Sequence, residues 1–156
     1  MAGVRPQTLT VTITETLTLA GSDRGSTHTQ TLSSMSEQAG RIVPVPTSEI
    51  IVLAFAATVP GPGAFNEADV RYIRLTNKDA DNFISLKFRD EDGTEFGIKL
   101  EHGASFIYGA SDEGVVDTMV ASGSALADPP SFADLVDITA RADTAACDLE
   151  YFVAGT

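Results

Sequence analysis

The sequence has no tryptophan, a single cysteine, and few basic residues. Because a disulfide needs two thiols, Cys147 excludes an internal disulfide, and the fold must depend on its core or on partner subunits. Cys147 alternates with Leu149, Tyr151 and Val153, which favours a buried apolar thiol over a nucleophile. Eight phenylalanines and three tyrosines are the only aromatic residues. This scarcity argues against a sugar-stacking platform, which depends on exposed aromatic faces.

Basic residues are also scarce: 22 acidic residues stand against 10 basic ones, for a net charge of −12. So negative a surface repels phosphate backbones, and the few basic residues do not cluster in the sequence, so we expect no nucleic-acid partner. No apolar run approaches the roughly 18 residues of a membrane span, and the N-terminus lacks the apolar core of a secretory signal. We therefore expect no membrane partner and no export.

The patterns that carry catalysis or metal binding are largely missing. The only histidines are His28 and His102, both beside turn-forming sequence, and neither His-x-His, Cys-x-x-Cys nor Gly-x-Ser-x-Gly occurs. We predict no enzyme, no catalytic residue, no metal and no cofactor. One constellation leaves an alternative open, because the alternating carboxylates of Asp90–Glu95 are similar to the start of a calcium loop. A solvated Asp-Gly hairpin turn explains the same residues.

Period-two alternation is strongest between Val70 and Tyr108. Three segments, 70–77, 83–89 and 96–100, alternate apolar and polar residues between turn clusters, which is typical of half-buried antiparallel strands. The short turns predict that these strands pair in sequence order as a β-meander. A further strand is expected at 104–108.

The N-terminal segment 8–19 has the strictest alternation in the chain. Threonines occupy one face, and the other face carries the partner-binding candidates Leu9, Val11, Ile13, Leu17 and Leu19. A strand this long is either covered within the fold or an arm that pairs with another chain. A returning strand at 29–35 would complete a hairpin over residues 8–35. The stiff Val43-Pro44-Val45-Pro46 segment predicts a hinge, so we divide the chain into an N-terminal arm, 1–42, and a body, 43–156.

The remaining segments complete an all-β reading. The apolar run at 49–58 predicts a strand covered on both faces, and Pro60-Gly61-Pro62-Gly63 a plain loop. Residues 128–135 predict a single helical turn, with Ser131 as its cap. Two last strands follow at 136–141 and 147–153. About eight strands at close spacing predict an antiparallel β-sandwich, jelly-roll-like, with an extended N-terminal β-hairpin or arm.

The body, residues 48–156, resembles small virion proteins of tailed bacteriophages, especially those of marine and cyanobacterial hosts. The resemblance covers about two thirds of the chain and rests on the order of strands and turns in four stretches: Val70–Asp79, Asn82–Phe88, Ala104–Phe106 and Ala142–Tyr151. It implies a capsid decoration (cement) protein that binds and stabilises the major capsid protein shell. The same layout also serves tail, neck and fibre-associated proteins.

The resemblance also implies that the protein is an oligomer, with a trimer favoured. It would be made in the host cytoplasm and lie on the capsid surface of the virion. The N-terminal arm would then exchange strands between copies or dock on the shell. A hypothesis of another class also stays open: a calcium- or sugar-binding β-sandwich module that holds its ligand at Asp90–Glu95.

Overall fold

The computed structural model describes residues 5–57, 64–109, 117–119, 121–122, 125–126 and 132–156. Within them the chain is all-β, with antiparallel sheets packed face to face and no helix. In the same residues there is no helix long and apolar enough to cross a membrane. The predicted fold class is confirmed. The predicted loop at 60–63 and the Ser131 cap lie outside the described residues.

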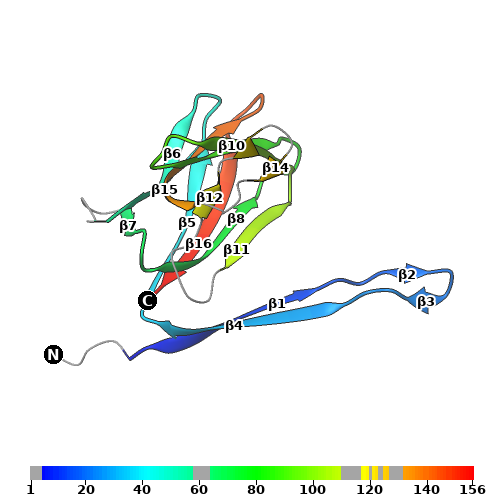
Figure 1. Cartoon of the computed structure of the whole chain (residues 1–156). Helices are drawn as coiled ribbons and strands as arrows, with labels where there is room; N and C mark the ends of the chain where they lie inside the picture. The colour runs from blue at the N-terminus through cyan, green and yellow to red at the C-terminus, as the bar shows by residue number, and fades with distance from the viewer. Residues whose placement is uncertain (1–4, 58–63, 110–116, 120, 123–124, 127–131) are drawn as a thin grey trace.

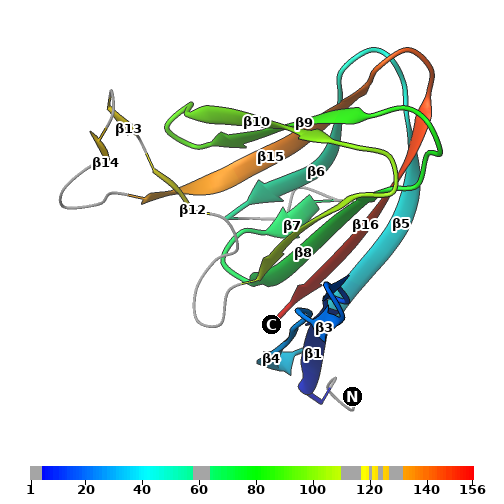
Figure 2. The same ribbon diagram turned by 90° about the vertical axis from the view of Figure 1, so that its right-hand side faces the viewer.

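Two sheets form the body, stacked as layers in Figure 2. The arm-side sheet has the order β11-β8-β16-β5, with bounds Ser105–Gly109, Val70–Asn77, Cys147–Gly155 and Glu37–Val45. The opposite sheet has the order β10-β9-β15-β6-β7, with bounds Glu95–Leu100, Ile84–Asp90, Phe132–Ala142, Ile50–Ala56 and Ala64–Asn66. Short strands complete the set: β12 (Asp117–Met119) on β15, and β13 (Ala121–Ser122) paired with β14 (Ala125–Leu126).

The strand order is that of a jelly roll. Numbered along the body, its eight long strands are β5, β6, β8, β9, β10, β11, β15 and β16. One sheet then reads 1-8-3-6 and the other 2-7-4-5, which is the order produced by two interlocked Greek keys. The predicted jelly-roll-like sandwich is therefore present in its topology as well as in its class.

The core lies between the two sheets, where the alternating apolar residues of both meet. Phe88 is fully buried there, stacked on Phe96 with ring centroids 4.6 Å apart and tilted against Phe106 at 5.1 Å. Leu86, Ile138, Ile73 and Leu149 are buried beside it. The alternation predicted from the sequence is thus the inward-facing set of a sandwich core.

The predicted meander is wrong in its pairing. The strands themselves are present, and β9 and β10 form a hairpin, but β8 belongs to the other sheet. The buried Asn77 side chain explains the crossing, since its Nδ2 donates to the carbonyls of Asn82, at 2.8 Å, and Leu100, at 3.1 Å. Asp79 accepts from the backbone amides of Asp81 and Asn82. These polar contacts shape a loop between layers, which period-two patterning cannot distinguish from a hairpin turn.

Two other expectations fail at the sandwich surface. Residues from 132 onward belong to strand β15, so no helical turn includes Phe132–Leu135. In β6, Val52, Leu53 and Phe55 are buried, but Ile51 is 61% exposed, so this strand is not covered on both faces. Its outward side belongs to the solvent-facing surface of the opposite sheet.

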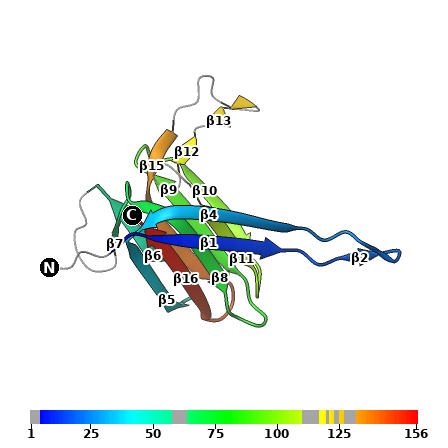
Figure 3. The same ribbon diagram turned by 90° about the horizontal axis from the view of Figure 1, so that it is seen from below.

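The N-terminal arm is a hairpin of β1 (Gln7–Thr14) and β4 (Thr27–Met35), with the short β2 (Thr18–Leu19) and β3 (Ser22–Asp23) near its tip. It lies below the body in Figure 1, and in Figure 3 it crosses the arm-side sheet and extends beyond it. The first strand therefore pairs within its own chain, and it ends at Thr14 rather than at residue 19.

The structure moves the boundary between arm and body toward the N-terminus. Residues 37–45 form β5, which pairs with β16 along its whole length, so Val43–Pro46 is not a hinge. Pro44 is tolerated because β5 is the edge of its sheet, where one side of the strand needs no backbone donor. The chain leaves the body at Ser36, whose amide donates to the Gly155 carbonyl at 2.9 Å.

We expect removal of residues 1–35 to preserve the body better than removal of residues 1–42. The longer deletion also removes six residue pairs between β5 and β16. At about 1 kcal/mol for each lost hydrogen bond, it should cost roughly 3 kcal/mol or more in free energy of unfolding. Urea denaturation of the two truncated chains measures the difference. Equal midpoints would contradict the boundary at Ser36, since neither chain retains the arm.

Candidate functional site

The base of the arm is held by a small apolar cluster separate from the main core. Leu32 and Met35 of β4 are buried against Tyr72 of β8 and Ala154 of β16. Leu9, Val11 and Phe152 border the cluster, and the rings of Tyr72 and Phe152 meet edge to face with centroids 5.9 Å apart. The arm is therefore packed onto the body at its base, not tethered by a flexible linker.

Strand register explains why this cluster lies on the outside of the sandwich. Tyr72 and Ala154 are directly paired across β8 and β16, while their neighbours Ile73 and Val153 point into the main core. Sequence alternation places Tyr72 on the face opposite Ile73, and the structure agrees. What alternation could not reveal is that this outer position is 4% exposed, because a segment from the other end of the chain covers it.

The arm passes over the edge of the sheet at a glycine. Gln30 of β4 donates from Nε2 to the Gly109 carbonyl of edge strand β11, at 3.5 Å. A Cβ at Gly109 would lie 3.0 Å from Gln30 Oε1 and 3.3 Å from Tyr72 Cδ2. The missing side chain thus lets the hairpin stay close to the sheet until it leaves the body.

Beyond β11 the arm carries apolar side chains that its own body does not cover. Ile13, Leu17 and Leu19 are 42%, 53% and 61% exposed, and the tip extends past the sheet in Figure 3. The reverse side of β1 and β4 is a ladder of exposed threonines, with Thr12 and Thr29 hydroxyls 3.3 Å apart. We call residues 13–26 the distal arm.

The five partner-binding candidates therefore separate into two groups. Leu9 and Val11 pack against the chain's own body at the base of the arm. Ile13, Leu17 and Leu19 lie in the distal arm and face solvent. The sequence shows one apolar face interrupted only by Glu15, and only the structure, through the position of the body edge at β11, divides it into a covered and an exposed part.

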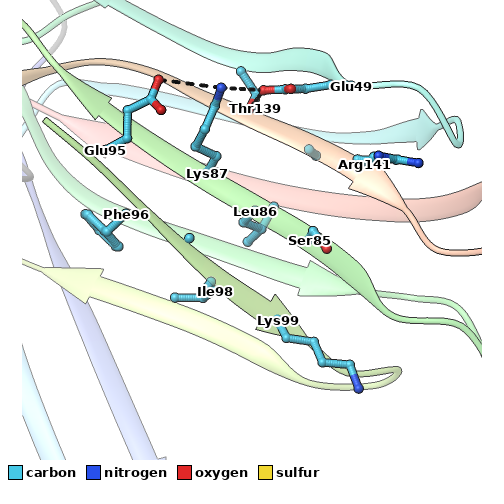
Figure 4. A pocket seen from close by; sticks show the side chains of 12 residues that line it. Glu49, Ser85, Leu86, Lys87, Glu95, Phe96, Ile98, Lys99, Thr139 and Arg141 are labelled. Carbon is cyan, nitrogen blue, oxygen red and sulfur yellow. Dashed lines mark hydrogen bonds and ion pairs between the residues drawn. The ribbon is translucent and has the colours of Figure 1, made fainter. Parts of the chain in front are cut away.

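A groove runs over the outer face of the opposite sheet, with a volume of about 550 Å³ (Figure 4). Lys87 of β9 lies at its centre, with its ammonium 2.8 Å from Glu49 Oε1 and 3.6 Å from Glu95 Oε1. The Thr139 hydroxyl donates to the same Glu49 oxygen. Phe96 also borders the groove, but its ring lies on the core side of the sheet, where it is stacked on Phe88.

This outer face gathers basic residues that are scattered in the sequence. Lys87, Arg89, Lys99 and Arg141 all stand on it, four of the ten in the chain. All four are engaged. Besides the Lys87 pairs, Lys99 pairs with Glu101, Arg89 pairs with Asp137, and Arg141 donates from Nε to the Thr47 carbonyl. Three of the four charges are paired with carboxylates and the fourth is hydrogen-bonded to the backbone, so this face is not a free cationic patch.

Two ion pairs on this outer face change the electrostatics of their members, one inside the groove and one beside it. The hydrogen bond from Lys87 lowers the pKa of Glu49 below its usual value, and the same bond raises the pKa of Lys87. Asp137 Oδ1 is buried without a hydrogen-bond partner among the described residues, while its Oδ2 accepts from Arg89. An orphaned buried oxygen is unfavourable by about 1–3 kcal/mol, which the Arg89 pair offsets in part.

The acidic turn at Asp90–Glu95 is arranged as a hairpin turn. Asp90 is buried, and its Oδ1 accepts from the Thr94 amide at 2.6 Å, while Gly93 takes a φ of +82°. Glu91 and Asp92 are exposed. Among the described residues no three acidic, histidine or cysteine side chains converge as a metal site would require.

The remaining candidates fall where the sequence placed them or close to it. Cys147 is 2% exposed, and burial is the main cause that raises the pKa of its thiol, so the predicted buried thiol is confirmed. His102 lies in a turn, whereas His28 lies on strand β4, and both are exposed.

Compared with protein-family models, curated proteins and solved structures, the chain matches none of them.

We expect Leu32→Ala to release the arm while the body stays folded. Leu32 is 1% exposed in the arm-base cluster, and deleting so buried a leucine costs about 2–5 kcal/mol. Hydrogen exchange with mass spectrometry should then show faster exchange in residues 7–35 and unchanged exchange in β9 and β16. Leu19→Ala, at an exposed position, is the matched control and should change neither. A uniform rise across the whole chain would show that the arm and body unfold together.

We expect alkaline pH to weaken the arm base through Tyr72. Burial raises the pKa of this phenol, and nearby Arg74 offsets only part of the rise. The stabilisation is therefore complete below the unfolded value of about 10 and is lost as pH rises through the higher folded value. Subtracting the ultraviolet phenolate titration of Tyr72→Phe from that of the wild-type chain isolates this group. A difference midpoint at or below pH 10 would refute the argument.

Proposed function

We propose that this chain is a non-enzymatic structural protein of a bacteriophage virion, a capsid decoration protein that binds the major capsid protein shell as an oligomer. The distal arm is the observation that carries the proposal. A hairpin anchored at its base projects three apolar side chains beyond the body, where only another molecule can cover them. Burying such side chains is the dominant favourable contribution in most protein association.

The architecture and the charge also support an assembly role. Jelly rolls are a recurrent building block of viral capsids, although a fold alone does not assign a function. A net charge of −12 opposes non-specific association, so that copies associate only where complementary surfaces meet. Because the arm is already anchored on the body, less conformational entropy is lost when it docks on a partner. In this proposal the protein is a homo-oligomer, with a trimer favoured, on the capsid surface.

A tail, neck or fibre-associated placement is the alternative within the same class, and copy number distinguishes the two. Quantitative mass spectrometry of purified particles of the encoding phage should give a copy number that is a large, fixed fraction of the major capsid protein. A handful of copies would move the protein to the tail, and its absence would refute a virion role. The calcium- or sugar-binding alternative is less well supported, because the groups of the acidic turn and of the groove mainly bind one another.

We expect the double substitution Leu17→Ser, Leu19→Ser to weaken binding to capsid shells by up to about 100-fold. Each leucine gains roughly 1.5 kcal/mol or more when fully buried, and a loss of 1.4 kcal/mol is a factor of ten in affinity. Co-sedimentation with shells that lack the protein gives the affinity. Thr16→Ser, Thr18→Ser is the control in the same segment and should bind normally. Unchanged binding by the leucine variant would refute a role for the distal arm.

A further inference from the structure

The outer face of the arm-side sheet is only partly covered by the chain's own arm. Residues paired across its four strands form rows, and the arm lies over the row Gln38, Ala154, Tyr72 and Gly109. Two further rows continue the same face. They are Gly40, Phe152, Arg74 and Ile107, followed by Ile42, Glu150, Thr76 and Ser105. We call these two the open rows.

The open rows have the chemistry of a docking surface for an apolar hairpin. Ile42 and Ile107 are 53% and 38% exposed, and Phe152 is half-buried between them and the arm-base cluster. A hollow of about 280 Å³ lies beside Gly40, where a side chain is missing. The charges of Arg74 and Glu150 neutralise each other at 2.5 Å, so the surface does not favour a strongly charged ligand.

The distal arm is also apolar, but it extends away from the open rows of its own chain. Ile13 follows Leu9 and Val11 on the side of β1 that faces the body, and Leu17 and Leu19 lie exposed further along. The arm passes β11 and leads away from the open rows of its own chain, as Figures 1 and 3 show. The distal arm of one chain can therefore reach such rows only on another chain.

We propose that the distal arm of one copy packs on the open rows of a second copy of this chain. This deepens the proposed function, because it rests on the arm as the assembling element and names its partner. The face already accepts the apolar side of this same hairpin in the covered row, and the open rows continue that contact surface. Residues 13–19 extend on the order of 20 Å, and four strands spaced about 4.8 Å apart present a surface of similar width.

The symmetry of such a contact follows from its two unlike surfaces. If two copies exchange arms reciprocally, the result is a closed dimer; if each arm docks on the next copy, the result is a ring or a filament. Like charges oppose association in either case, since each copy carries −12. Added salt screens that repulsion and leaves apolar contact intact, so association should strengthen with salt.

Light scattering coupled to size-exclusion chromatography tests the proposal on the full chain. We expect an oligomer for the wild-type protein, and monomers for Leu17→Ser, Leu19→Ser and for Ile42→Ser, Ile107→Ser. The control is Ile51→Ser, which changes a still more exposed isoleucine, at 61%, on the opposite sheet and should remain oligomeric. A wild-type chain that stays monomeric at high salt overturns the proposal, as does an oligomer that survives both double substitutions.

Crosslinking between two differently tagged chains identifies the contact directly. A Leu17→Cys chain mixed with an Ile42→Cys or an Ile107→Cys chain should give a disulfide-linked heterodimer on oxidation. The same Leu17→Cys chain mixed with Ser85→Cys, on the outer face of the opposite sheet, should not. Cys147 is buried and stays in place in all chains. Crosslinking no greater than with Ser85→Cys would refute the assigned face.

The outcome separates this proposal from the function on which it rests. A monomeric chain that still binds capsid shells through its distal arm would overturn self-docking and leave the decoration role standing. An oligomer that depends on the arm but binds no particle would support self-docking and overturn the decoration role.

Discussion

Tyr72 stands on the outer face of its sheet, where a large apolar ring needs cover, and the hairpin of β1 and β4 supplies that cover. The position of the arm follows from this one contact. Because Leu32 and Met35 fix the hairpin over Tyr72 and Ala154, the direction of the arm is set by packing, and its tip is carried past the sheet edge at Gly109. The exposed leucines of the tip and the uncovered rows of the sheet are both consequences of where the hairpin is anchored.

The two outer faces of the sandwich differ in the side chains that they present to solvent. On the opposite sheet, Lys87 pairs with Glu95 of β10 and with Glu49, just before β6, and Arg89 pairs with Asp137 of β15, so the charges of that face are paired with one another. On the arm-side sheet the outward residues include Tyr72, Phe152 and Ile42, whose apolar side chains can be buried only if another segment packs over them. Covering the second face would bury mainly apolar surface, whereas covering the first would take paired charges out of water, which is unfavourable.

Sequence patterning predicted the strands well because alternation reports directly which side of a strand is buried. The inward sets Ile84, Leu86, Phe88 and Ile73, Leu75 are those that alternation indicates. Alternation failed to predict which strands pair, as in the predicted meander, because the period of a strand does not say to which sheet the strand belongs. It failed at Pro44 because a proline reads as a hinge when the free edge of a sheet can accept it equally well. The receiving surface for the arm was beyond sequence reasoning, since its rows join residues from four distant segments.

The surface beneath the base of the arm is completed by β16, the last of the described strands in chain order. Ala154 belongs to the arm-base cluster, and the Gly155 carbonyl accepts from Ser36 where arm and body meet. The hairpin itself is local and can close early, but its anchoring site joins residues more than a hundred positions apart, and such contacts form late. The N-terminal hairpin can therefore be anchored only after β16 has been synthesised and has paired with β8, so the direction of the arm depends on a strand far along the chain.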